Sequence, residues 1–310
     1  MDDQTKEDYV PAIAIDFEAT EASDEAQATE IGICPIAFSE IGVLNPLAQP
    51  IAVRCKPDRP ISFGAMSVTG ICPEDVENEP NHTIVITQCM PVGPAYIIGH
   101  NVDYDIQVAA NSGVDTSSYK AICTLAIARA LYPDGEHSLG ALLYRFDYNE
   151  ARRYAQNAHS AAYDLRFCVR LLRLFCRELG IKDMQTLYEF SEQARIPKVM
   201  PMGKFKGSVI ADLNKTQPER GYLFWVIGNI TDNYLVQACQ STAEQCELEC
   251  TQGNKIFKKG QVYKISQFLS ESTLTIIATD NTEHIAKVEE KNIVAYFVDK
   301  NVNNAVFKAA

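Results

Sequence analysis

Four acidic residues, drawn from three segments far apart in the chain, constrain this protein more than any other feature. The residues are Asp16, Glu18, Asp105 and Asp164. Each lies beside an apolar run that is expected to form a strand or a helix, so each segment alone is a weak indication. Together with a histidine, His159, they form the side-chain set that holds two divalent cations and activates a water.

The first segment begins with the apolar run Val10–Ile15, which predicts a buried strand. Asp16 and Glu18 follow at its end, and because they are two residues apart their side chains lie on one face. Phe17 between them is expected to point to the opposite face and into the core. Taken alone, this pair also fits an ordinary exit from a strand into a turn.

The second segment repeats this arrangement. The run Ala95–Gly99 predicts a strand, and Asp105 follows near the start of a short helix expected over Asp105–Ala110. Asp103 is a second acid that could take the same role as Asp105. We interpret His100, at the end of the strand, as a structural histidine bonded to the backbone.

The third segment opens a long helix. Ser160 is a good N-cap residue, and the apolar positions from Leu165 to Leu179 recur at helical spacing. Asp164 then lies in the first turn and is expected to face the site, with His159 just before the helix. The opposite stripe of the helix is basic and is interpreted as a solvated face. It consists of Arg166, Arg170, Arg173 and Arg177.

These residue types suit hydrolysis of a phosphodiester. Mg²⁺ is a hard cation that takes carboxylate, water and phosphate oxygens. Two such ions about 3.5–4 Å apart can hold the attacking and the leaving oxygen of an in-line displacement. A nearby imidazole can accept the proton of the attacking water, because its pKa lies near working pH.

With these motifs in view, the chain resembles the DnaQ-like, or DEDDh, exonuclease superfamily. Its first motif is matched by Asp16, Glu18 and Thr20. Its second is matched by His100, Asn101, Tyr104 and Asp105. Its third is matched by His159, Ala161 and Asp164. The likeness covers roughly residues 9–187 and includes Glu30-Ile31, which resembles a pair that recurs on the family's next strand.

The resemblance implies a mixed β-sheet of the ribonuclease H type with flanking helices. It also implies a metal-dependent 3′→5′ exonuclease that releases nucleoside 5′-monophosphates, with two Mg²⁺ ions, or Mn²⁺ in their place. Asp16, Glu18, Asp105 and Asp164 would bind the metals, and His159 would be the general base. Thr20 and Asn101 are expected to contact the substrate. DNA 3′ ends, single-stranded or duplex, are the expected substrate, and DNA repair the expected setting.

Two alternatives stay open. One is a 3′→5′ exonuclease that trims RNA ends. The other is a nucleic-acid-binding or interaction protein that kept the fold without the activity. The complete set of carboxylates argues against the second alternative, because converging acids without a metal repel one another.

Downstream, residues 200–225 resemble the C-terminal module of exodeoxyribonuclease X. Gly203 and Gly207 bracket a tight turn that carries Lys204 and Lys206. This turn is either a packed hairpin with surface lysines or a clamp that contacts phosphate, in which case both lysines bind substrate. The nearby aromatic residues are interpreted as core. They are Tyr222, Phe224 and Trp225.

Short strand-like runs in the last part of the chain predict a small all-β barrel of the SH3-like type, with an unknown partner. We therefore expect an exonuclease domain over 1–192, a small module over 193–239 and the barrel over 255–310. Residues 240–254 are expected to be a linker.

Charge and composition narrow the classes further. The chain carries a net charge of −12, and residues 1–192 hold 14 Lys and Arg against 28 Asp and Glu, whereas residues 193–238 hold 6 against 3. An acidic protein has no general basic footprint for nucleic acid, so metals and local patches must grip phosphate, which favours strand ends. No apolar run is long enough to cross a membrane. Ten cysteines without a C-x-x-C pair, and no signal peptide, indicate a reducing, cytoplasmic setting.

Overall fold

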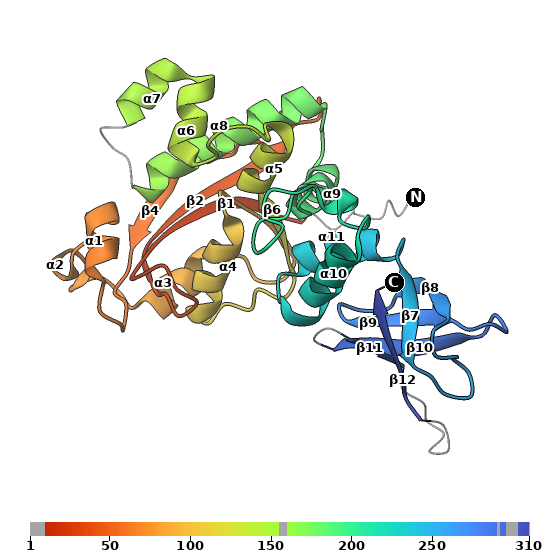
Figure 1. Ribbon diagram of the computed structural model, residues 1–310. Helices are drawn as coiled ribbons and strands as arrows, with labels where there is room; N and C mark the ends of the chain where they lie inside the picture. The colour runs from red at the N-terminus through yellow and green to blue at the C-terminus, as the bar shows by residue number, and fades with distance from the viewer. Residues whose placement is uncertain (1–9, 155–159, 290–291, 296–302, 310) are drawn as a thin grey trace, which may run out of the picture. The chain divides into compact units, whose positions relative to one another are not determined.

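The computed structural model describes residues 10–154, 160–289, 292–295 and 303–309 (Figure 1). The chain divides into two compact units, Met1–Arg195 and Ile196–Ala310. Each unit has its own core, so each is described by itself. His159, the expected general base, lies outside the described residues.

The first unit is built on a mixed sheet. Its strands are β1 Ala12–Ala19, β2 Ala28–Phe38, β3 Leu44–Pro46, β4 Ile51–Arg54, β5 Ala95–Gly99 and β6 Tyr119–Cys123. Their order is β3-β2-β1-β5-β6, and β4 pairs with β2. β1 and β2 are antiparallel, whereas β5 runs parallel to both β1 and β6. This sheet confirms the predicted α/β class of the ribonuclease H type.

Helices cover both faces of this sheet (Figure 1). They are α1 Phe63–Thr69, α2 Pro73–Val76, α3 His82–Cys89, α4 Val102–Asn111, α5 Thr124–Leu131, α6 Leu139–Phe146, α7 Tyr148–Tyr154, α8 Ala161–Leu179 and α9 Met184–Arg195. Because successive residues of a strand point to opposite faces, β1 divides its side chains between two cores. Ala12 and Ala14 pack with α5, α6 and α8, whereas Ile15 and Phe17 pack with α3 and α4.

The elements beside the motifs differ in detail from the sequence-based expectation. β1 continues to Ala19, so Asp16 and Glu18 lie within the strand and not after its end. β5 has the expected bounds. α4 begins at Val102, three residues before the expected start, because Asn101 takes a left-handed conformation with φ 75° and turns the chain directly into the helix.

The second unit combines two helices with a barrel. Its helical elements are η1 Ile210–Asp212, α10 Gln217–Asn229 and α11 Asn233–Ala243. Its strands are β7 Glu247–Gln252, β8 Val262–Phe268, β9 Thr273–Ile277, β10 Glu283–Glu289, β11 Asn292–Ala295 and β12 Ala305–Ala309. The six strands close in the order β10-β11-β12-β7-β8-β9, and every pair is antiparallel. The predicted all-β barrel is therefore present.

Residues 240–254 are not a linker, because they contain the end of α11 and all of β7. One hydrophobic cluster joins the two parts of this unit, from Leu223 and Phe224 of α10 to Leu274 of β9 and Phe307 of β12. The shared core argues against a separation between the expected module, 193–239, and the expected barrel, 255–310. The division into these two domains stays a prediction.

All ten cysteines are free thiols. Burial raises the pKa of several of them, to about 12 for Cys176 and Cys239, so these thiols stay protonated and behave as small apolar side chains. Among the described residues, none of the helices combines the length and the apolar character that crossing a bilayer requires.

Candidate active site

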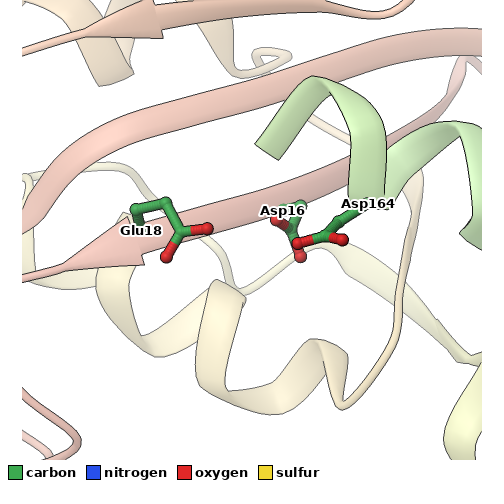
Figure 2. A group of neighbouring side chains, drawn as sticks. All are labelled: Asp16, Glu18 and Asp164. Carbon is green, nitrogen blue, oxygen red and sulfur yellow. The ribbon is translucent and has the colours of Figure 1, made fainter. Parts of the chain in front are cut away.

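Three of the predicted acidic residues come together on the first unit. Asp16 and Glu18 project from β1, and Asp164 projects toward them from the first turn of α8 (Figure 2). One carboxylate oxygen from each residue lies within 4.8 Å of the others. Glu18 and Asp164 are buried, and Asp16 is half-buried.

The alternation of β1 explains why Asp16 and Glu18 face α8. Both have the same parity as Ala12 and Ala14, which pack in the α8 core. Phe17 lies on the other face with α3 and α4, as the sequence predicted. The strand therefore presents its acids to the helix that carries the third one.

A close approach between β2 and α8 brings Asp164 into place. Gly32 lies directly opposite Asp16 in the antiparallel register. A Cβ atom at Gly32 would lie 2.8 Å from the carbonyl oxygen and 2.9 Å from the Cβ of Ala161, the first residue of α8. Only a glycine leaves room for the helix start at this point.

We expect Gly32→Ala to lower the free energy of unfolding by about 1–3 kcal/mol, because the added methyl group overlaps with helix backbone that cannot rotate away. If the position of α8 sets the position of Asp164, the nuclease activity expected from the sequence should also fall. Gly64→Ala in α1 is the matched control, since its new Cβ meets only the Ser62 hydroxyl at 3.8 Å. Urea unfolding and activity are measured side by side. Wild-type values for Gly32→Ala would contradict the role of this close approach.

Glu30 is a site residue to which the sequence analysis assigned no role. It lies on β2 directly opposite Glu18. Its Oε1 accepts a hydrogen bond from the Ala161 amide at 3.2 Å, and its Oε2 lies 3.4 Å from Arg54 Nε. Ser160 takes the N-cap position, but its side chain makes no capping bond. Glu30 thus supplies the acceptor at the start of α8. The sequence feature that could have identified Glu30 was the resemblance of Glu30-Ile31 to a pair that recurs on this strand in the DEDDh superfamily.

Asp105 lies close to this cluster but is held apart from it. Its Oδ1 accepts a hydrogen bond from the Phe17 amide at 3.0 Å, which ties α4 to β1 between the two strand acids. Gly99 makes room for it, since a Cβ there would lie 3.1 Å from Asp105 Oδ2. The three-carboxylate group comprises Asp16, Glu18 and Asp164, so Asp105 as a metal ligand stays a prediction.

The electrostatics of the site favour a bound cation. Burial, followed by repulsion from Asp164 and Glu30, raises the pKa of Asp16 to about 8. Burial, followed by repulsion from Asp16, Asp164 and Glu30, raises the pKa of Glu18 to about 9. Burial and the charge of Asp16 likewise hold the pKa of Asp105 well above its usual value. Among the residues that the structure describes, no basic side chain stands among the causes that set the pKa of Asp16 or Glu18.

The donor set fits a hard divalent ion. Asp16, Glu18 and Asp164 offer carboxylate oxygens alone, which Mg²⁺ and Mn²⁺ prefer to nitrogen or sulfur ligands. A cation would also relieve the repulsion that raises these pKa values. The identity of the ion stays a prediction.

His100 has the environment of a structural residue. Its Nε2 lies 2.8 Å from the His137 carbonyl oxygen, and its Nδ1 lies 3.0 Å from Thr124 Oγ1. Because a carbonyl oxygen can only accept a hydrogen bond, Nε2 carries a proton. Burial lowers the pKa of His100 to about 4, which makes it neutral near pH 7. Both ring nitrogens are engaged, as expected for the structural interpretation.

Asp103 does not compete with Asp105. It lies exposed on α4 and forms an ion pair with Arg195, with Nη1 at 2.6 Å from Oδ2 and 2.8 Å from Oδ1. Asp105, two residues later, is buried. The extra acid of the second motif therefore stabilises the contact between α4 and the end of α9.

The two expected substrate contacts of this unit differ. Thr20 is completely buried, and its Oγ1 accepts a hydrogen bond from the Gln27 amide at 3.1 Å. This burial argues against a substrate contact by the Thr20 side chain, whose hydroxyl instead holds the β1–β2 connection. Asn101 is exposed at the start of α4, so its side chain is accessible, and its substrate contact stays a prediction.

The basic stripe of α8 faces away from the carboxylates. Arg173 and Arg177 are exposed, and Arg170 pairs with Asp147. These three arginines line a cavity of about 640 Å³ beside α6 and the turn at Gly42. None of the three site carboxylates lines this cavity. The stripe is therefore a solvated face, as expected, and not part of the acidic site.

Lys204 and Lys206 belong to the second unit. They lie exposed on a hairpin whose turn contains Gly203 and Gly207, with φ of 69° and 88°. The Gly207 amide donates to the Met200 carbonyl at 2.9 Å, so the turn is a packed hairpin with accessible lysines.

The fold and the site together define a class of protein. It is an α/β protein whose ribonuclease H-like sheet and one crossing helix present a group of carboxylates suited to divalent cations. A family comparison identifies the class further. The chain belongs to the exonuclease family, whose model matches residues 13–172.

The individual proteins to which the chain is similar share only a modest part of its sequence. Exodeoxyribonuclease 10 of Escherichia coli strain K12 is 26% identical over 199 residues, which cover 64% of this chain and 86% of that protein. Exonuclease X in complex with 5′ overhanging duplex DNA is a similar solved structure, with 23% identity, a TM-score of 0.42 and coverage of 57% of this chain and 99% of that one. E. coli exonuclease I with a dA16 oligonucleotide has 14% identity and a TM-score of 0.47, and the match covers 87% of this chain and 55% of that one.

Proposed function

We propose that this protein is a metal-dependent 3′→5′ exonuclease that hydrolyses DNA from its ends and releases nucleoside 5′-monophosphates. The observation that carries the proposal is the convergence of Asp16, Glu18 and Asp164 in a chain of the exonuclease family. The choice of DNA follows the name of the exodeoxyribonuclease relative. The free cysteines favour a reducing compartment, so we propose a cytoplasmic enzyme.

In this proposal each residue has a defined task. Asp16, Glu18 and Asp164 would hold the ions, and Asp105 would complete the set from α4, where its bond to the Phe17 amide fixes its orientation. Two divalent ions bound there would stabilise the attacking and leaving oxygens of an in-line displacement. His159 accepts the proton of the attacking water. Glu30 and Gly32 position the start of α8, and therefore Asp164.

An assay with end-labelled oligonucleotides tests this function. Single-stranded DNA, duplex DNA with either overhang and RNA of the same sequence are incubated with Mg²⁺, and each is labelled at the 5′ or the 3′ end. We expect a 5′-labelled DNA strand to shorten in single-nucleotide steps, and a 3′ label to appear at once as a mononucleotide. Faster shortening of RNA would favour the RNA-trimming alternative. No product from any substrate would favour the non-catalytic one.

The raised pKa values predict how stability depends on pH without metal. Asp16 and Glu18 have pKa values of about 8 and about 9 in the folded protein, against about 4 in the unfolded chain. Between these limits the folded state binds more protons, so stability is greatest at low pH and falls as pH rises toward 8. We expect the melting temperature in EDTA to fall from pH 5 to pH 8.

Metal should reverse this trend, because it binds the deprotonated carboxylates and stabilises the folded state more at higher pH. Asp16→Asn removes one raised group and should make the EDTA curve flatter. A melting temperature in EDTA that rises steadily from pH 5 to pH 8 would contradict the assigned repulsion.

A further inference from the structure

The hairpin of the second unit and α10 together form a cluster of half-buried aromatic rings. Tyr222 stacks on Trp225 at a centroid distance of 5.5 Å and an interplanar angle of 24°. Phe205, from the hairpin turn, meets Tyr222 edge-on at 5.2 Å. Phe224, between Tyr222 and Trp225 on the same helix, is 2% exposed. Phe224 thus lies in the core, as the sequence predicted, whereas Tyr222 and Trp225 pack against the core and keep part of their surface exposed.

The turn is shaped to hold this cluster. Gly203 has a φ of 69°, and a Cβ there would lie 2.0 Å from the Tyr222 hydroxyl oxygen. That hydroxyl donates to the Met202 carbonyl at 3.2 Å. Two strands of the hairpin are held by the Val199–Val209 bridge. The turn is therefore locked against the aromatic helix, and its side chains stand at a defined place beside the rings.

The hairpin that carries Phe205 is basic. Residues 196–210 contain three lysines, Lys198, Lys204 and Lys206, and no acidic residue. All three are exposed, and Lys204 Nζ lies 5.4 Å from the centre of the Phe205 ring. The nearest acid along the chain, Asp212, is paired with Lys215 at 2.7 Å. This basic segment contrasts with the protein as a whole, whose net charge is −12.

We propose that this aromatic platform, formed by Phe205, Tyr222 and Trp225 with Lys204 and Lys206, binds single-stranded DNA. Aromatic faces stack with unpaired bases of any sequence, and adjacent cations follow the phosphates, which together make the usual grip on a single strand. The choice of DNA rests on the proposed function, but the platform itself does not depend on the acidic site. It would hold unpaired nucleotides of a substrate independently of metal.

Trp225 makes the test specific, because it is the one tryptophan of the chain. The full-length protein in EDTA is titrated with oligo(dT) of about twelve nucleotides, within the range that single-strand sites cover. We expect saturable quenching of tryptophan fluorescence, with the same midpoint as the anisotropy of a labelled oligonucleotide. Binding seen by anisotropy without any quenching would place the DNA elsewhere and overturn the proposal.

Two variants separate stacking from charge. Phe205→Leu keeps an apolar side chain for packing but removes the ring, so affinity should fall roughly five- to a hundredfold with an unchanged salt slope. Lys204→Ala with Lys206→Ala should weaken binding and reduce the salt slope by about 1.4, since each single-strand phosphate contact contributes roughly 0.7. Lys258→Ala with Lys259→Ala, two exposed lysines of the same unit, is the charge-matched control.

The remaining outcomes also decide the matter. If Phe205→Leu is folded by circular dichroism and binds like the wild type, the platform does not stack with bases. If the control pair lowers the salt slope as much as the Lys204 and Lys206 pair, the grip is nonspecific. If RNA of equal length binds more tightly, the assignment to DNA is wrong. Binding is measured in EDTA, and cleavage is measured separately with Mg²⁺. A protein that quenches in EDTA but does not cleave with Mg²⁺ would contradict only the proposed enzyme function. One that cleaves with Mg²⁺ but does not quench in EDTA would contradict only the platform.

Discussion

Asp16→Asn should abolish cleavage while leaving a folded protein. Asp16 lies within 4.8 Å of both Glu18 and Asp164, and its charge raises the pKa of Glu18, so it is placed to bind a shared cation. Its amide replacement keeps the volume and removes the negative charge. Asp24→Asn changes an exposed acid of the same unit and is the matched control, which should cleave normally.

Metal binding supplies a readout that does not depend on catalysis. Mg²⁺ or Mn²⁺ should raise the melting temperature of the wild type and of Asp24→Asn, because a ligand that binds only the folded state stabilises it. Asp16→Asn should lose most of that shift, and its melting temperature in EDTA should not fall, since one repelling carboxylate is gone. Undiminished cleavage by a clean preparation of Asp16→Asn would disprove the metal assignment.

His159→Ala should lower kcat by about 10²–10⁴-fold, the usual contribution of a general base. The carboxylates remain, so the thermal shift with Mg²⁺ and the affinity for substrate should stay near wild-type values. The measurement is a single-turnover assay at saturating protein, together with thermal unfolding with and without metal.

His100→Ala is the comparison for this prediction. His100 is half-buried and has both ring nitrogens bonded, and its pKa is lowered to about 4, so the ring is neutral near pH 7 and is not placed to act as the general base. Its replacement should mainly lower stability, by removing the bonds to Thr124 and to the His137 carbonyl. If His100→Ala loses more kcat than His159→Ala, the general base has been assigned to the wrong histidine.

Local sequence patterns were sufficient to predict those features that depend on a single strand or helix. The alternation of β1 placed Asp16 and Glu18 on one face, and Phe17 on the other, because the direction of a strand side chain depends only on its parity. The run Ala95–Gly99 had the bounds of β5, and the apolar spacing after Leu165 marked α8. The barrel as a whole was also recognisable, although β7 was taken for part of a linker because its polar residues hide the alternation, and β12 was not predicted as a strand.

The sequence by itself therefore determined the fold class, the family and the identity of the acids. Tertiary structure alone decided which of these acids meet. Glu30 acts on α8 across 131 residues of chain, and Gly32 matters because Ala161 lies against it. Asp103 stays exposed and pairs with Arg195 of α9, whereas Asp105 is buried against β1. The side chain of Thr20 is inaccessible to solvent because it bonds within the β1–β2 connection. Such outcomes depend on distances between segments, which no local pattern of residue types encodes.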